Sequence, residues 1–235
     1  MAELLKSGAV LIHVPKTGGT WVREVLRKLN LLYRDSRMGL KHSTPEHIND
    51  ILRFRCGHFI RHWPFRPTVT PKKLRDAFKF CFVRNPLRWY ESWWKYMAGH
   101  WHPWEADRWH PQRMIDNCGD DDFNVFLANI LRNRPGYVSE MYSWYTEGVD
   151  FVGKCESLAD DLVRALDAAG LNVDIEVLHR FPSVNQSKAH LGEPEWDSMI
   201  LQKIIDSESA SIERFGYWDE VVEFGLAKGV MITRP

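Results

Sequence analysis

One short turn of the sequence, PKTGGT at residues 15–20, gathers a lysine, two glycines and two hydroxyls. An apolar, β-branched run at 9–14 precedes it, and apolar residues at helical spacing follow it through residue 30. A strand end, a glycine turn and a helix N-terminus together present backbone N–H groups and a favourable dipole, which suits phosphate or sulfate binding. A simple tight turn is the alternative. Lys16 precedes both glycines rather than following them, which disfavours a Walker A NTPase.

A second polar group follows the apolar run KFCFV at 79–83. Arg84 comes directly after that run, and Ser92 lies two turns into the helix predicted to begin at Pro86. Because ligands of parallel α/β sheets bind at the carboxyl ends of the strands, we expect Arg84 to stand beside the first turn. Its guanidinium can hold a phosphate through two hydrogen bonds, or it can simply neutralise a nearby carboxylate.

The helix after Pro86 is predicted to have one buried and one polar side. The buried stripe consists of Leu87, Tyr90, Trp94 and Met97. Three polar residues, Arg88, Ser92 and Lys95, follow one another at intervals of four and three on the other side. This division is typical of a helix that faces a ligand.

Strand-like and helix-like patterns alternate along the chain. The predicted strands are 9–14, 56–60, 79–83 and 150–154, and the predicted helices are 20–30, 44–52, 71–77, 86–97, 121–132, 138–146, 157–169 and 195–214. This order predicts an α/β fold of three α/β/α layers around a mostly parallel sheet, and 235 residues suit one domain spanning 1–235.

Composition excludes several classes of protein. A hydrophobic share of 44% with 26% charged residues is that of an ordinary globular protein. Basic and acidic residues number 31 each, so no overall basic field favours nucleic acid. The N-terminus reads as neither a signal peptide nor a membrane span, and the four cysteines show no metal-ligand spacing, so we expect a cytoplasmic protein with free thiols and no metal.

Taken together, HVPKTGGTWV and VRNPLRWYES resemble the donor-binding segments of the sulfotransferases that use 3′-phosphoadenosine 5′-phosphosulfate (PAPS). The resemblance, closest to carbohydrate-type and bacterial members, implies a P-loop-like nucleotide-binding fold. It also implies that Arg84 and Ser92 bind the 3′-phosphate. The residues implied at the 5′-phosphosulfate are Lys16, Thr17, Gly18, Gly19, Thr20 and Trp21. A weaker likeness at 151–156 and at 184–188 adds Asn185, Ser187 and Lys188 to the donor site, whereas the RKG signature of the cytosolic branch is absent.

The resemblance places the general base after the second strand, where Gly57-His58 stands. His58 would take the acceptor's proton while Lys16 stabilises the charge that grows on the leaving group, and no metal is required. His13 and His62 compete with His58 for this role, and a carboxylate such as Glu46 or Asp50 is a further alternative.

Residues 99–120 form a predicted irregular loop on the acceptor side. Trp101, Trp104 and Trp109, with His62, are the predicted acceptor contacts, because indole faces stack on sugars and phenols. The tryptophans can instead anchor the loop to the core or to a second subunit. The predicted reaction is sulfuryl transfer from PAPS to a hydroxyl or amine, favouring a carbohydrate, with adenosine 3′,5′-bisphosphate (PAP) released. The alternatives are a kinase with an atypical phosphate loop and a non-catalytic glycan- or nucleotide-binding protein.

Overall fold

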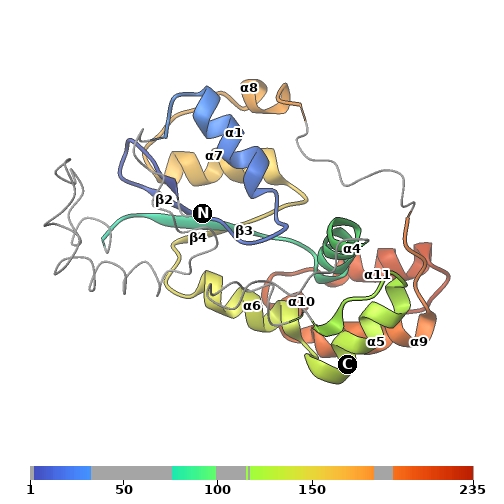
Figure 1. The fold of residues 1–235 in the computed structure, drawn as a ribbon. Coiled ribbons are helices and arrows are strands. Elements are labelled where there is room, and N and C mark those ends of the chain that lie inside the picture. Colours follow the sequence, from blue (N-terminus) through green and yellow to red (C-terminus); the bar gives the residue numbers. More distant parts are fainter. Residues whose placement is uncertain (1–2, 33–75, 99–114, 116, 183–192, 235) are drawn as a thin grey trace, which may run out of the picture. The chain divides into compact units, whose positions relative to one another are not determined.

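The computed structural model describes residues 3–32, 76–98, 115, 117–182 and 193–234 (Figure 1). The chain divides into two compact units. Unit 1 comprises Met1–Val83 and Trp144–Val184, and unit 2 comprises Arg84–Ser143 and Asn185–Pro235. The single domain over 1–235 stays a prediction.

Unit 1 is built on a four-stranded sheet in the order β1-β2-β3-β4. Its strands are β1 (Glu3–Leu4), β2 (Val10–Ile12), β3 (Lys79–Val83) and β4 (Phe151–Lys154). β2, β3 and β4 are parallel neighbours, and β1 pairs antiparallel with β2. The predicted strands at 9–14, 79–83 and 150–154 are therefore confirmed, and β1 is an addition. The strand predicted at 56–60 and the helix at 44–52 lie outside the described residues, as does most of the helix predicted at 71–77.

Three helices of unit 1 cover one face of this sheet (Figure 1). They are α1 (Gly19–Lys28), α7 (Leu158–Ala168) and α8 (Ile175–His179). Leu11, Phe80 and Phe82 share this face, because Leu11 pairs with Phe80 and side chains alternate along a strand. They form one buried cluster with apolar residues of the three helices, including Val22, Leu26, Leu162, Leu166 and Leu178. This confirms the α/β class, while the three-layer arrangement stays a prediction.

Unit 2 is helical in its described part. Its helices are α4 (Pro86–Met97), α5 (Phe123–Asn133), α6 (Tyr137–Thr146, which runs on into unit 1), α9 (Ser198–Ser207), α10 (Ser209–Arg214) and α11 (Trp218–Ala227). The predictions at 86–97, 121–132 and 138–146 are confirmed. The single helix predicted at 195–214 is wrong, since α9 begins only after the Asp197 cap and ends before Glu208. Within the part of the chain that the structure describes, no helix has the length and apolar character to cross a membrane.

Unit 2 is centred on a buried carboxylate, Glu208, between α9 and α10. Its Oε1 accepts hydrogen bonds from the Tyr90 hydroxyl at 2.6 Å and from the Val138 N–H at 3.0 Å. Its Oε2 accepts bonds from both the N–H and the hydroxyl of Ser139, each at 2.7 Å. Two of these donors are backbone N–H groups of the first turn of α6, which lack partners within the helix. One side chain thus joins α4, α6 and the α9–α10 junction.

Candidate functional site

The glycine turn has the predicted placement between β2 and α1. Lys16 and Gly18 both have left-handed backbone conformations, with φ of 63° and 82°. The Thr17 hydroxyl is buried and donates to the Val14 carbonyl at 3.0 Å, so it stabilises the turn itself. Gly18 makes no side-chain cap, and the first turn of α1 holds no acidic residue. The N-terminal dipole of α1 is therefore not neutralised from its own first turn, which suits an anionic ligand.

At both glycines of the turn, neighbouring side chains leave no space for a Cβ atom. A Cβ added at Gly18 would lie 2.5 Å from Cδ2 of Leu158, at the start of α7. A Cβ added at Gly19 would lie 2.3 Å from Cδ2 of His13. The His13 ring, one of the candidate bases, therefore lies against the backbone where α1 begins.

Replacing Gly18 with alanine is expected to lower the free energy of unfolding by about 2–3 kcal/mol, since it combines a left-handed backbone with a steric clash. Gly8→Ala is the matched control, because Gly8 has a φ of 92° but nothing within 4 Å of its Cβ position. The control is expected to lose only about 1 kcal/mol. Urea denaturation of both variants measures the difference. Equal losses of unfolding free energy in the two variants would show that the Leu158 side chain moves away from the added methyl group without a measurable cost.

The segment after β4 is fixed by a buried carboxylate. Oδ2 of Asp161 accepts hydrogen bonds from the Lys154 N–H at 2.6 Å and the Ser157 hydroxyl at 3.0 Å. Arg164 pairs with the other oxygen. The Cβ position of Gly18 lies 3.5 Å from Sγ of Cys155, so the anchored segment also borders the glycine turn.

Arg84 stands at the switch from β3 to α4, and its backbone is held from both sides. The buried Tyr142 hydroxyl accepts a hydrogen bond from the Arg84 N–H at 3.0 Å and donates one to the Arg84 carbonyl at 2.7 Å. Asn85 caps α4 by accepting from the Leu87 N–H at 3.0 Å, and Pro86 occupies the first helical position. The sequence Arg-Asn-Pro thus ends the strand and starts the helix without an intervening loop.

A pocket of about 210 Å³ lies within unit 2. Its lining residues are Arg84, Arg88, Glu91, Ser92, Lys95 and Glu193. The structure thereby brings together the two residues predicted at the 3′-phosphate and the two cations of the predicted polar side of α4. It adds two carboxylates that sequence reasoning missed. Glu91 had a signal in its spacing of three from Arg88, whereas nothing local in the sequence pointed to Glu193.

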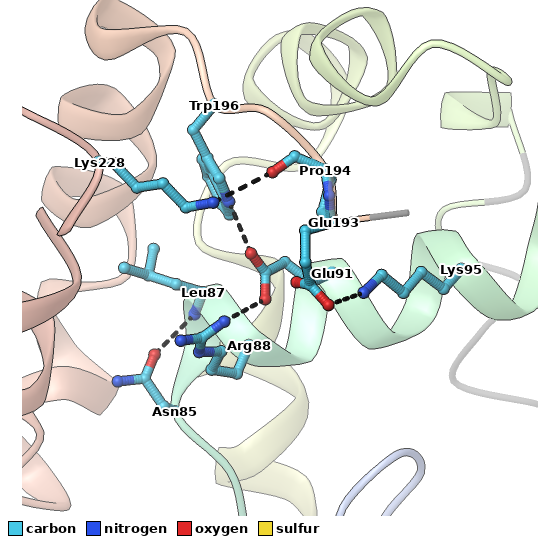
Figure 2. Close-up of polar contacts among 9 residues, drawn as sticks. All are labelled: Asn85, Leu87, Arg88, Glu91, Lys95, Glu193, Pro194, Trp196 and Lys228. Atoms are coloured by element: carbon cyan, nitrogen blue, oxygen red, sulfur yellow. Dashed lines mark hydrogen bonds and ion pairs between the residues drawn. The ribbon is translucent and has the colours of Figure 1, made fainter. Parts of the chain in front are cut away.

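Glu91 holds Arg88 in place at this pocket (Figure 2). The buried carboxylate accepts from Nη1 of Arg88 at 2.9 Å and from Nε1 of Trp196 at 3.0 Å. The Arg88 guanidinium also lies 4.6 Å from the ring centroid of Phe224. The lining of the pocket holds three cations and two carboxylates, so its net charge favours an anion.

Of the remaining predicted contacts, the structure describes only Thr20 and Trp21. Thr20 is exposed, and Trp21 packs partly against the core of unit 1. The candidate bases other than His13, and the predicted acceptor and late donor residues, lie outside the described residues and stay predictions; they are Glu46, Asp50, His58, His62, Trp101, Trp104, Trp109, Asn185, Ser187 and Lys188. Among the described residues, no cluster of three or more His, Cys, Asp or Glu side chains is placed to hold a metal ion.

The parallel strands, the covering helices and the cationic pocket define an α/β protein suited to an anionic ligand. The sequence model of the Sulfotransferase family matches residues 6–211, and the chain therefore belongs to the sulfotransferase family. This membership supports a transferase that moves sulfuryl groups. Comparisons with curated proteins and with solved structures gave no match.

Proposed function

We propose that this protein transfers the sulfuryl group of PAPS to a hydroxyl or amine acceptor and releases PAP. The observation that carries the proposal is the pocket in unit 2, where Arg84 and Ser92 meet eight residues apart in the sequence. A phosphate monoester carries up to two negative charges and three acceptor oxygens, which a guanidinium and a hydroxyl can bind together. The glycine turn before α1 supplies a second site suited to an anion.

The proposed donor contacts follow from these two sites. Arg84 and Ser92 bind the 3′-phosphate, with Arg88 adding positive charge beside them. Lys16 and the N–H groups at the start of α1 bind the 5′-phosphosulfate. Asn185, Ser187 and Lys188 complete the nucleotide site on the strength of the sequence resemblance alone.

The proposed transfer is in line at sulfur. His58 accepts the acceptor's proton as the acceptor oxygen or nitrogen forms a bond to sulfur. The bond between sulfur and the bridging oxygen breaks, and its electron pair leaves with PAP. Lys16 stabilises the charge that develops on that oxygen. The carbohydrate acceptor is proposed from the tryptophans at 101, 104 and 109.

Isothermal titration calorimetry in metal-free buffer tests the donor assignment. PAP is expected to bind with micromolar affinity, and ADP, which lacks a 3′-phosphate, at least about tenfold more weakly. Arg84→Ala is expected to weaken PAP binding about 10- to 100-fold, because a charged hydrogen-bond donor is lost from the phosphate.

Arg132→Ala is the matched control, since Arg132 is an exposed arginine of α5 in the same unit. Its PAP affinity is expected to equal that of the wild type. Tighter binding of ADP or Mg·ATP than of PAP would overturn the proposal in favour of a kinase.

A further inference from the structure

The pocket holds two ion pairs whose burial is opposite. In the first, the side chain of Glu91 is 6% exposed and that of its partner Arg88 is 47% exposed. In the second, the side chain of Lys95 is 14% exposed and that of Glu193 is 70% exposed, and Nζ of Lys95 lies 2.8 Å from Oε1 of Glu193. In the first pair the acidic side chain is the buried partner, and in the second the basic side chain is the buried partner.

The two carboxylates also differ in how firmly they are held. Glu91 has a second donor in Trp196 and is buried within unit 2. Glu193 has Lys95 as the sole hydrogen-bond partner of its carboxylate among the described residues. Releasing Glu193 into water costs little, because an exposed carboxylate is readily hydrated, whereas releasing Glu91 would strand a buried charge.

The basic residues around Glu193 favour the charged form of its carboxyl group. Its hydrogen bond to Lys95 is the main cause that lowers the pKa of its carboxyl, and the charges of Arg88 and Lys228 act in the same direction. The cations of the pocket thus stabilise a negative charge at the position of this carboxylate. A phosphate with up to two negative charges would be attracted more strongly by the same field.

We propose that Lys95 is a further phosphate-binding residue and that Glu193 is its resident counter-ion, which the 3′-phosphate of the ligand displaces. The inference rests on the proposed function, since it takes PAPS and PAP as the ligands. Lys95 lies one helical turn beyond Ser92 on α4, and both line the pocket with Arg84. On binding, the ammonium exchanges the carboxylate for a phosphate oxygen, and Glu193 turns to solvent. Displacement weakens the binding of the donor and of the product, so Glu193 promotes product release.

Calorimetric titration of the full chain with PAP tests this exchange. Glu193→Gln is expected to tighten PAP binding about threefold to fivefold, the range that a weak ion pair allows. Lys95→Met keeps an apolar stem and is expected to weaken binding about tenfold or more. In the Lys95→Met background, Glu193→Gln is expected to change PAP affinity less than it does alone, because the ion pair through which Glu193 competes with the phosphate is already lost.

Two controls separate the exchange from a general charge effect. Glu195→Gln removes an exposed carboxylate two residues away and is expected to leave PAP affinity unchanged. Adenosine 5′-phosphate lacks the 3′-phosphate, and its affinity is expected to be equal in the wild type and Glu193→Gln. If PAP binds the wild type and is lost in Arg84→Ala while Glu193→Gln changes nothing or weakens binding, the exchange is overturned and the proposed function stands. If PAP does not bind the wild type, both are overturned.

Discussion

Replacing Lys16 with methionine is expected to lower kcat for sulfuryl transfer about 100- to 1,000-fold. Lys16 lies in the turn between β2 and α1 with a left-handed φ of 63°, which few residues other than glycine adopt. A conformation of this cost persists where the surrounding structure fixes it, and such positions cluster at functional sites. This magnitude is typical of removing one preorganised hydrogen-bond donor that stabilises the charge developing in the transition state.

The measurement is PAP released from PAPS, followed by anion-exchange chromatography with water, simple sugars, phenols and amines as acceptors. PAP affinity in Lys16→Met is expected to fall by less than about tenfold, because the charge that Lys16 stabilises grows mainly in the transition state. Lys6→Met is the matched control, since Lys6 is exposed in the same unit and its ammonium donates to the Asn30 side chain at 2.7 Å, away from the glycine turn. A kcat within about threefold of the wild type in Lys16→Met would contradict the assigned role.

Elements with local start signals could be predicted from the sequence. The Asn85 side chain caps α4 by accepting from the Leu87 N–H, and the Asp122 side chain caps α5 by accepting from the N–H groups of Asn124 and Val125. The apolar run at 79–83 is buried along its whole length as β3. In these cases the signal lies within a few residues of the element that it specifies.

Elements that depend on tertiary contacts were missed or wrong. β1 contains Glu3, a charged residue in a two-residue strand, which is buried in an ion pair with Arg23 of α1 at 2.7 Å. The predicted helix 195–214 breaks at Glu208, whose side chain is used by α4 and α6 rather than by its own helix. α11 was not predicted, although Gly216, with a φ of 63°, separates it from α10.

In the site, too, local features could be predicted from the sequence and features that depend on tertiary contacts could not. The polar side of α4 followed from helical periodicity, so Arg88, Ser92 and Lys95 were found together. Glu193 comes from a segment almost 100 residues away in the sequence and reaches Lys95 only through the packing of unit 2. Periodicity gives the residues of one face, but it does not give what lies opposite them.

Replacing Glu208 with glutamine is expected to lower the free energy of unfolding by about 2–3 kcal/mol. Each oxygen of this buried carboxylate accepts a backbone N–H, from Val138 and from Ser139. An amide keeps one oxygen, so its NH₂ group would face an N–H and leave a buried donor without an acceptor. Glu208→Ala leaves every donor unpaired and is expected to cost about 3–5 kcal/mol. Glu223→Gln, at an exposed position of α11, is the control and is expected to stay within about 0.5 kcal/mol of the wild type.

The pH dependence of this stability tests whether burial or hydrogen bonding dominates at Glu208. Burial raises the pKa of its carboxyl above the ordinary 4.5, although Tyr90, Ser139 and the two N–H groups favour the charged form. A carboxyl with a raised folded pKa contributes stability that is complete below its unfolded pKa and is lost as the pH rises through the folded pKa. The difference in unfolding free energy between the wild type and Glu208→Gln, which does not titrate, is therefore expected to be largest below pH 4.5 and to shrink towards neutrality. A difference that grows with pH would show instead that the converging donors outweigh the cost of burying the charge.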